Sequence, residues 1–289
     1  MNGVSADPDQ IAWEWRDHLC AGLEAALMPM TGRYLRPVVL QSGGMDSLAL
    51  TAALLSLGYE PLLATFTIGG TEYADLRRAR LVADTFGLVL RVVHIPRTEE
   101  QLVSDIRAAK RAGATLKTHI QCHQPVAHMA RMITHECGPV EVVMGTGGIC
   151  EDSRACMVAL GTLGEEAARQ IRHETCIPGG KEGSATRFMH LALLDEGHTV
   201  IEPYTMPILS EYALALDLAE INSPRQKGIA LRAFPEFFQR CPVWAKNSSL
   251  QVGAGIRDWH DTLLQSAWNP GREFRSVVSI YNRMDANVA

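Results

Sequence analysis

The segment from Val38 to Ser47, VVLQSGGMDS, constrains the fold more than any other part of this 289-residue chain. Three β-prone apolar residues run into paired glycines, and a second apolar run follows from Leu48 to Leu57. This pattern predicts a strand, a tight turn and a helix in immediate succession. Such a turn presents unpaired backbone N–H groups at the positive end of a helix dipole, so it predicts an anion-binding site.

The side chains of this turn restrict the class of ligand that it is expected to bind. Gly43 and Gly44 let the backbone approach an anion without an intervening Cβ, and Ser42 and Ser47 add hydroxyl groups. Asp46 would repel a bare phosphate, so a divalent cation is expected to accompany the anion. The sequence therefore predicts a Mg²⁺-bound nucleotide, and an ordinary βα turn is the alternative.

The string SGGMDS at residues 42–47 resembles the SGGxDS signature of the PP-loop ATP pyrophosphatases. The usual phosphate-loop pattern, G-x-x-x-x-G-K-[ST], is absent. The resemblance implies that ATP is cleaved between its α and β phosphates and that AMP is transferred to a substrate.

Strand and helix patterns alternate through the first half of the chain. Further strands are predicted at 61–68, 88–95 and 140–144, and helices at 11–28, 73–86, 99–112 and 125–135. This alternation predicts an α/β fold with a parallel sheet covered by helices on both faces. The second half is predicted to be mostly helical, with helices at about 185–196, 210–220, 225–237 and 256–268.

We expect one domain over residues 1–289. A nucleotide-binding core at about 10–150 would be completed by a helical part at about 151–270.

Glycines follow two other predicted strands, at Gly69 and at Gly145 with Gly147. Because the carboxyl ends of parallel strands meet at one edge, these glycines are expected to line one nucleotide cleft, with simple loop punctuation as the alternative. Glu151 and Asp152 lie just beyond. They are expected to face Asp46 across a metal site, or to form an N-cap pair for a helix that starts near residue 156.

Composition excludes several classes of function. The formal net charge of −5 disfavours wholesale nucleic-acid binding, and no apolar stretch is long enough to span a membrane. The seven cysteines include no C-x-x-C pair, which favours reduced thiols. We therefore expect a soluble cytoplasmic protein.

Later segments, taken in order, resemble the synthetase domain of the asparagine synthetase family, which includes the β-lactam and carbapenam synthetases. The similar segments are FTIG at 66–69, TEYAD at 71–75, GTGG at 145–148, KGIALRAF at 227–234 and WAK at 244–246. The resemblance covers roughly residues 10 to 268. It implies a fold of the HUP, or adenine nucleotide alpha hydrolase-like, type.

The resemblance also implies roles for individual residues. The loop residues Ser42, Gly43, Gly44 and Ser47 would bind pyrophosphate, and Asp46 would ligate Mg²⁺. The residues that would flank adenine and ribose are Phe66, Gly69, Gly145 and Gly147. Lys246 would neutralise charge on the α-phosphate and on the intermediate that the nitrogen nucleophile forms.

Two departures from the family pattern stand out. Thr146 occupies the position of a glutamate that would act as base on the incoming amine, and a threonine cannot take that proton at neutral pH. Either Glu151 or Asp152 substitutes, or the nucleophile arrives deprotonated, or the chemistry has changed. No glutaminase domain precedes the loop, so ammonia, a separate glutaminase or a substrate amine is expected to supply nitrogen.

The densest group of histidines and cysteines lies between residues 119 and 137. His119 and His123 have i,i+4 spacing, which leaves a zinc site as one interpretation. Substrate contact by Cys122, His123 or Gln124 is the favoured one.

Together these patterns predict an AMP-forming carbon-nitrogen ligase that uses ATP and Mg²⁺. It would adenylate a small-molecule carboxylate and let ammonia or an amine displace AMP. The predicted catalytic residues are Lys246, Asp46 and Glu151, and the predicted metal ligands are Asp46 and Asp152. Two alternatives stay open: a PP-loop enzyme that thiolates a nucleobase or converts it to a nitrile, and a nucleotide-binding module with altered catalysis.

Overall fold

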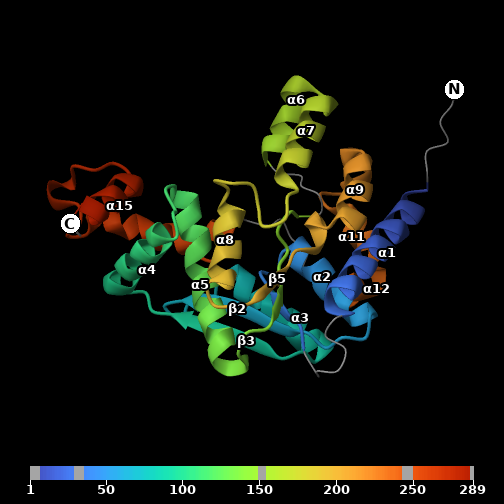
Figure 1. Cartoon of the computed structure of the whole chain (residues 1–289), viewed down its shortest axis with the longest axis horizontal. Coiled ribbons are helices and arrows are strands. Elements are labelled where there is room, and N and C mark those ends of the chain that lie inside the picture. The colour runs from blue at the N-terminus through green and yellow to red at the C-terminus, as the bar shows by residue number, and fades with distance from the viewer. Residues whose placement is uncertain (1–6, 29–35, 149–153, 243–249, 287–289) are drawn as a thin grey trace.

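The computed structural model describes residues 7–28, 36–148, 154–242 and 250–286. At its centre lies a parallel sheet (Figure 1). Its five strands follow the order β3-β2-β1-β4-β5. The strands are β1 (Val38–Leu40), β2 (Leu62–Ile68), β3 (Leu90–Ile95), β4 (Glu141–Val143) and β5 (Thr199–Ile201). The predicted α/β class is confirmed. The sequence pattern missed β5, whose three residues are too short to show a period of two.

The strand order places a switch point beside β1. From β1 the chain builds outward through β2 and β3, and it then returns to add β4 and β5 on the other side. In open α/β sheets, ligands bind at the carboxyl ends of the strands where the order reverses in this way. The SGGMDS loop follows β1, so the topology places it at that point.

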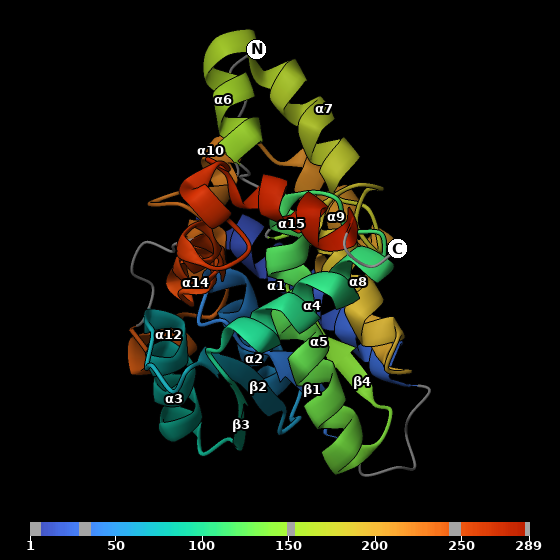
Figure 2. The same cartoon turned by 90° about the vertical axis from the view of Figure 1, so that its left-hand side faces the viewer.

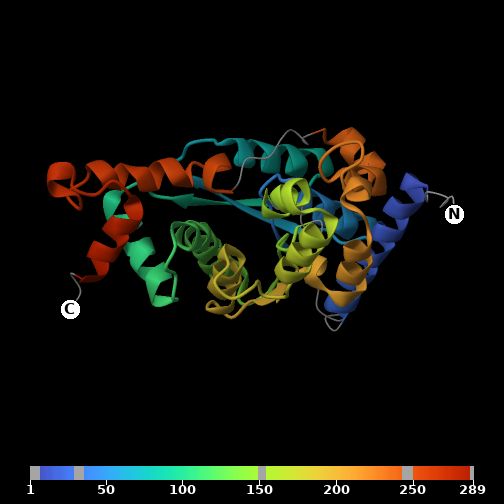
Figure 3. The same ribbon diagram turned by 90° about the horizontal axis from the view of Figure 1, so that it is seen from above.

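Helices cover both faces of the sheet, as Figure 3 shows with the strands lying between helical layers. One hydrophobic cluster joins Val39 and Leu63 to helices on one face. Those helices are α1 (Pro8–Leu27), α2 (Met45–Ser56), α3 (Ala74–Phe86), α9 (Pro207–Ala215), α11 (Gly228–Ala233) and α12 (Pro235–Arg240). Both halves of the chain therefore contribute to a single core.

The second cluster contains the neighbouring strand residues Val38, Leu40 and Ala64, which point to the opposite face. Its helices are α4 (Glu99–Arg111), α5 (Lys117–Cys137), α8 (Ala185–Leu194), α14 (Ile256–Asp261) and α15 (Val277–Ala286). This alternation between clusters is the period-two pattern of strands that are buried on both faces.

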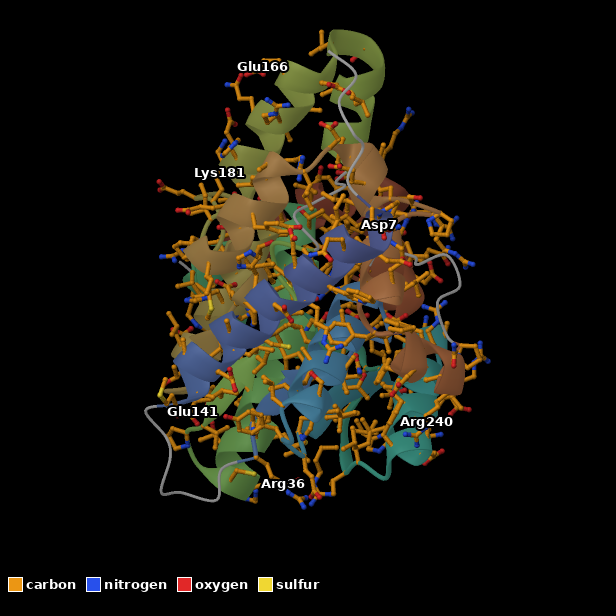
Figure 4. All side chains as sticks on the ribbon, turned by 90° about the vertical axis from the view of Figure 1, so that its right-hand side faces the viewer. Asp7, Arg36, Glu141, Glu166, Lys181 and Arg240 are labelled. Carbon is orange, nitrogen blue, oxygen red and sulfur yellow. The ribbon has the colours of Figure 1, made fainter. Side chains whose placement is uncertain are left out.

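A helical hairpin of α6 (Arg154–Leu163) and α7 (Glu165–Thr175) projects from the body (Figure 2). Glu166, near its tip, lies at the opposite end of the molecule from Arg36 and Glu141, which mark the start of β1 and β4 (Figure 4). The short remaining elements are η2 (Pro203–Thr205), α10 (Leu218–Ile221), α13 (Leu250–Gly253), η3 (Thr262–Gln265) and η4 (Pro270–Arg272). Among the described residues, no helix is both long and apolar enough to cross a membrane.

Prolines account for two differences from the predicted helices. Helix α5 begins at Lys117, two turns before the predicted start, and contains Pro125 in its interior. Burial of its apolar face outweighs the local cost of that proline. The predicted helix at 225–237 is instead divided between α11 and α12, because the residue before Pro235 is biased away from helical geometry.

A buried polar network joins α4, α5, α14 and α15. His260 is fully buried, with Nδ1 at the Tyr281 hydroxyl and Nε2 2.9 Å from Gln124 Oε1. Gln124 Nε2 donates to Asp105 Oδ2, which also contacts His128. Burial lowers the pKa of His260 from 6.5 to about 3, so the ring is neutral in the folded protein.

This network predicts a specific acid sensitivity. The native state holds His260 neutral, so its contribution to stability is complete above the unfolded pKa of about 6.5 and is lost as the pH falls toward about 3. Relative to His260→Gln, the wild type should lose up to about 1.4 kcal/mol of unfolding free energy per pH unit in that window. Urea unfolding between pH 7.5 and pH 5 would measure the difference. The exposed His173→Gln variant should keep the wild-type slope, and equal slopes in all three proteins would contradict the assignment.

Candidate functional site

The loop after β1 has the conformation that its glycines predicted. Gly43 has φ +69°, and Gly44 precedes the first turn of α2. Gly44 N donates to Ser42 Oγ at 3.2 Å, and Ser47 Oγ donates to the Gly44 carbonyl at 3.0 Å. Among the described residues, no side chain makes a capping hydrogen bond to α2. The amino end of this helix can therefore receive an anion.

The loops after β1 and β4 lie against each other. A Cβ added at Gly145 would lie 3.2 Å from Asp46 Cβ and 3.4 Å from Ser47 N. At Gly43, an added Cβ would lie 2.4 Å from Arg78 Cβ. Gly43 thus permits an approach that a side chain would block, and Gly145 permits a tight one. The predicted convergence of the two strand ends is present.

A cavity of about 180 Å³ opens at this convergence. Five of the predicted nucleotide-binding residues line it: Ser42, Asp46, Ser47, Phe66 and Gly145. Its remaining walls are mostly apolar and come from β1, β2, α5 and α8. An apolar pocket with a few oxygen groups at one end suits a nucleoside whose phosphates reach the loop.

Other predicted residues lie beside this cavity without lining it. Gly43 and Gly44 shape the loop, Gly69 packs against Arg97, and Gly147 packs against Thr205. A larger groove of about 530 Å³ lies between α1, α2 and α12, and it includes none of the predicted site residues.

Asp46 is held by two side chains from the second half of the chain. Lys227 Nζ lies 2.6 Å and 2.8 Å from the two carboxylate oxygens of Asp46. The buried Tyr204 hydroxyl donates to the Asp46 carbonyl at 2.8 Å. Lys227 itself has φ 58°, and its N–H donates to Asn222 Oδ1. The sequence places Lys227 in a family-like segment but gives no sign that it pairs with Asp46.

A second acid lies on the cavity wall. Asp75 is buried, and burial raises the pKa of its carboxyl to about 6 against the opposing charge of Arg78. Arg78 Nη1 is 3.6 Å from Asp75 Oδ1, and the stem of Arg78 covers Gly43. This arrangement places a guanidinium group beside the loop that follows β1.

The comparison with known families concerns a segment within the first half of the chain. Residues 36–148 match the family model described as asparagine synthase. This segment is asparagine synthetase-like. The matched segment contains strands β1 to β4 and the SGGMDS loop. No curated protein matches the chain significantly.

The asparagine synthetase-like loop suits a magnesium ion in its donor chemistry. Mg²⁺ prefers hard oxygen ligands and is usually held by one or two carboxylates together with substrate phosphates. Asp46 supplies such a carboxylate beside the hydroxyls of Ser42 and Ser47. Lys227 contacts the same oxygens, so a metal at Asp46 would share or displace this ammonium group.

Thr146, the departure from the family pattern, lies on the cavity wall beside an acid that sequence reasoning missed. Its Oγ1 donates to Glu202 Oε1 at 2.5 Å. Glu202 follows β5 directly and is 5% exposed. Because the pattern did not reveal β5, Glu202 gave no signal as a residue at the end of a strand.

Three predicted residues, Lys246, Glu151 and Asp152, lie outside the described residues. Their assignments as catalytic or metal-binding residues stay predictions.

In the histidine and cysteine segment, His119 and Gln124 contact other side chains of the protein, whereas Cys122 lines the cavity. His119 stacks on Phe188, and both amide atoms of Gln124 bond within the buried network. Cys122 lines the cavity, but burial raises the pKa of its thiol to about 12. Within the described ranges, no three metal-binding side chains gather, so nothing there supports zinc.

The loop geometry predicts that Gly43→Ala is more disruptive than an equivalent change elsewhere. Gly43 and Gly87 have similar φ values of +69° and +65°, but an added Cβ at Gly87 meets no described atom within 4 Å. We expect Gly87→Ala to cost only the left-handed strain, about 1 kcal/mol, and Gly43→Ala to cost about 1–3 kcal/mol more. Urea unfolding would measure both changes. Calorimetric titration with Mg-ATP should show weakened binding for Gly43→Ala alone. If the two variants lost equal amounts of stability and of Mg-ATP affinity, the result would contradict the role of the contact between Gly43 and Arg78.

Proposed function

We propose that this protein is an ATP-dependent amide-forming ligase. It adenylates a substrate carboxylate with release of pyrophosphate, and a nitrogen nucleophile then displaces AMP. The observation that carries this proposal is the SGGMDS loop itself, which opens onto an apolar cavity and belongs to a segment matched by the asparagine synthase model.

The first step requires the protein to hold a triphosphate. The amino end of α2 and the hydroxyl of Ser42 supply hydrogen-bond donors for the β and γ phosphates, and Ser47 would join them by turning its hydroxyl away from the Gly44 carbonyl. Asp46 would hold Mg²⁺, which when bound neutralises phosphate charge and orients the leaving pyrophosphate. Adenylation matters because it replaces a poor leaving group, oxide or hydroxide, with AMP.

Lys227 gives this step a second cation. In the described structure its ammonium group contacts Asp46, within reach of the phosphate loop. When Mg-ATP binds, we infer that Lys227 moves its contact from Asp46 to the phosphates, where negative charge grows as pyrophosphate leaves. Lys246 stays the predicted cation for the α-phosphate and the acyl intermediate.

The nucleobase-modifying alternative has less support. A tRNA-directed enzyme needs a basic surface, but the formal net charge is −5. Thiolation needs a reactive sulfur, whereas the cavity thiol of Cys122 is buried and protonated.

The proposed reaction class predicts which products form from ATP. Incubation with Mg-ATP, ammonium and a panel of carboxylates should release AMP and pyrophosphate in equal amounts, dependent on a carboxylate. Asp46→Asn should abolish pyrophosphate release while the circular dichroism spectrum is retained, because the metal loses its protein carboxylate. Product separation by ion-exchange chromatography would measure all the nucleotides. Formation of ADP would exclude this mechanism.

The inferred role of Lys227 predicts a larger effect on turnover than on stability. Lys227→Met should slow pyrophosphate release by about 10²–10³-fold, because one cation facing the leaving group is lost. The exposed Lys181→Met, which breaks only the pair with Glu174, should stay within about twofold. Steady-state pyrophosphate release would compare them. Equal rates for the two variants would remove Lys227 from the reaction.

A further inference from the structure

We propose that Arg78, which lies outside the SGGMDS string, binds the terminal phosphates of the nucleotide from the side of α3. This inference rests on the proposed function and adds to it a residue that selects for a polyphosphate. In this role the planar guanidinium group grips two oxygens of one phosphate, and the SGGMDS loop holds the rest of the pyrophosphate unit.

The stem of Arg78 packs directly on the SGGMDS loop. An ideal Cβ at Gly43 would lie 2.4 Å from Cβ of Arg78, 3.3 Å from its Cγ and 3.1 Å from its Cδ. The guanidinium group begins at Nε, the atom bonded to Cδ, so the positive charge lies beside the loop. Glycine at position 43 is what allows this approach, because any side chain there would collide with the arginine.

The far end of the guanidinium group reaches the wall of the cavity. Arg78 Nη1 lies 3.6 Å from Oδ1 of Asp75, three residues earlier on α3, and Asp75 lines the cavity. The side chain of Arg78 is only 16% exposed. The guanidinium group therefore lies at the junction between the loop and the cavity. A nucleoside in the cavity whose phosphates extend to the loop would bring its terminal phosphates to this junction.

The contact with Asp75 does not by itself explain why an arginine lies here. A tight ion pair would hold the pKa of Asp75 below its usual 3.8, but burial raises it to about 6 against the lowering effect of Arg78. The separation of 3.6 Å also exceeds the length of about 2.7–2.9 Å that is typical of a charge-assisted hydrogen bond. A guanidinium group has several N–H donors, so this loose contact does not exhaust them.

The neighbouring arginines of α3 show that burial is particular to Arg78. Arg77 and Arg80 are exposed, and Arg80 pairs at the surface with Glu72. Arg78 instead turns toward the loop and loses part of its hydration, which is unfavourable for a charged group. A phosphate bound at the junction offsets that cost by supplying an anion of matching geometry.

Arg78 and Lys227 approach the loop from different halves of the chain. Lys227 contacts the carboxylate of Asp46 at the start of α2, whereas Arg78 covers Gly43. A lysine acts as a point charge, but an arginine presents a rigid fork that fits two oxygens of a phosphate. Arg78 is therefore suited to orient the terminal phosphates, and Lys227 to neutralise charge beside Asp46.

Binding in the absence of turnover isolates this role. The compound α,β-methylene-ATP resists cleavage at the bond where pyrophosphate leaves, so calorimetric titration with its Mg²⁺ complex measures affinity alone. Arg78→Met should weaken binding of this analogue and of Mg-pyrophosphate by about 10–100-fold, because charge-assisted contacts with phosphate are lost. The affinity for adenosine, which has no phosphate, should stay within about twofold of the wild-type value.

Matched variants separate phosphate binding from a structural role. Arg78→Lys keeps the charge without the fork, so it should recover only part of the pyrophosphate affinity. The adjacent exposed change Arg77→Met should leave all three affinities unaltered. If Arg78 only ordered the cavity wall, Arg78→Met would weaken adenosine binding as much as pyrophosphate binding, and that result would overturn the proposal. Unchanged pyrophosphate affinity in Arg78→Met, or full recovery in Arg78→Lys, would also overturn it.

A crystal structure of the wild type with Mg-α,β-methylene-ATP tests the contact without relying on a variant that folds. A guanidinium nitrogen of Arg78 should lie about 2.7–3.2 Å from an oxygen of the β or γ phosphate. Bound nucleotide whose terminal phosphates do not contact Arg78 would overturn this inference and leave the ligase proposal standing. Binding through Arg78 without release of AMP and pyrophosphate for any carboxylate would overturn the ligase proposal alone. A wild type that binds neither the analogue nor pyrophosphate would overturn both.

Discussion

The ion pair between Asp46 and Lys227 joins the two halves of this chain at the SGGMDS loop. Asp46 lies at the start of α2, in the half that carries the SGGMDS signature, whereas Lys227 comes from a segment 181 residues later. Tyr204 holds the main chain of the same aspartate. The loop is thus fixed by the helical half, so the anion site depends on correct packing of both halves around one core.

This dependence also shapes the charge of the site. One end of the cavity holds Asp46 with Lys227 and Asp75 with Arg78, so each acid there has a cationic neighbour. Beyond Thr146, Glu202 is buried as an anion among hydrogen-bond donors.

The sequence predicted the elements with long, regular patterns and missed those that depend on tertiary context. Helix α2 and strand β2 follow their predictions closely, because strong local periodicity specifies them. The three residues of β5 have no period to detect. Gln124 belongs to the set Cys122, His123 or Gln124 for which substrate contact is predicted. Its two amide atoms bond to Asp105 and His260, and these contacts exist only after α14 packs on α5.

By itself the sequence determined the strand, turn and helix around SGGMDS, because backbone geometry and glycine conformation are local properties. It also determined that Thr146 cannot act alone as a base, which follows from the chemistry of a hydroxyl group. Only the tertiary structure decided that Lys227 meets Asp46 and that Glu202 lies behind Thr146. Those contacts follow from strand order and helix packing, which bring together residues that no local pattern relates.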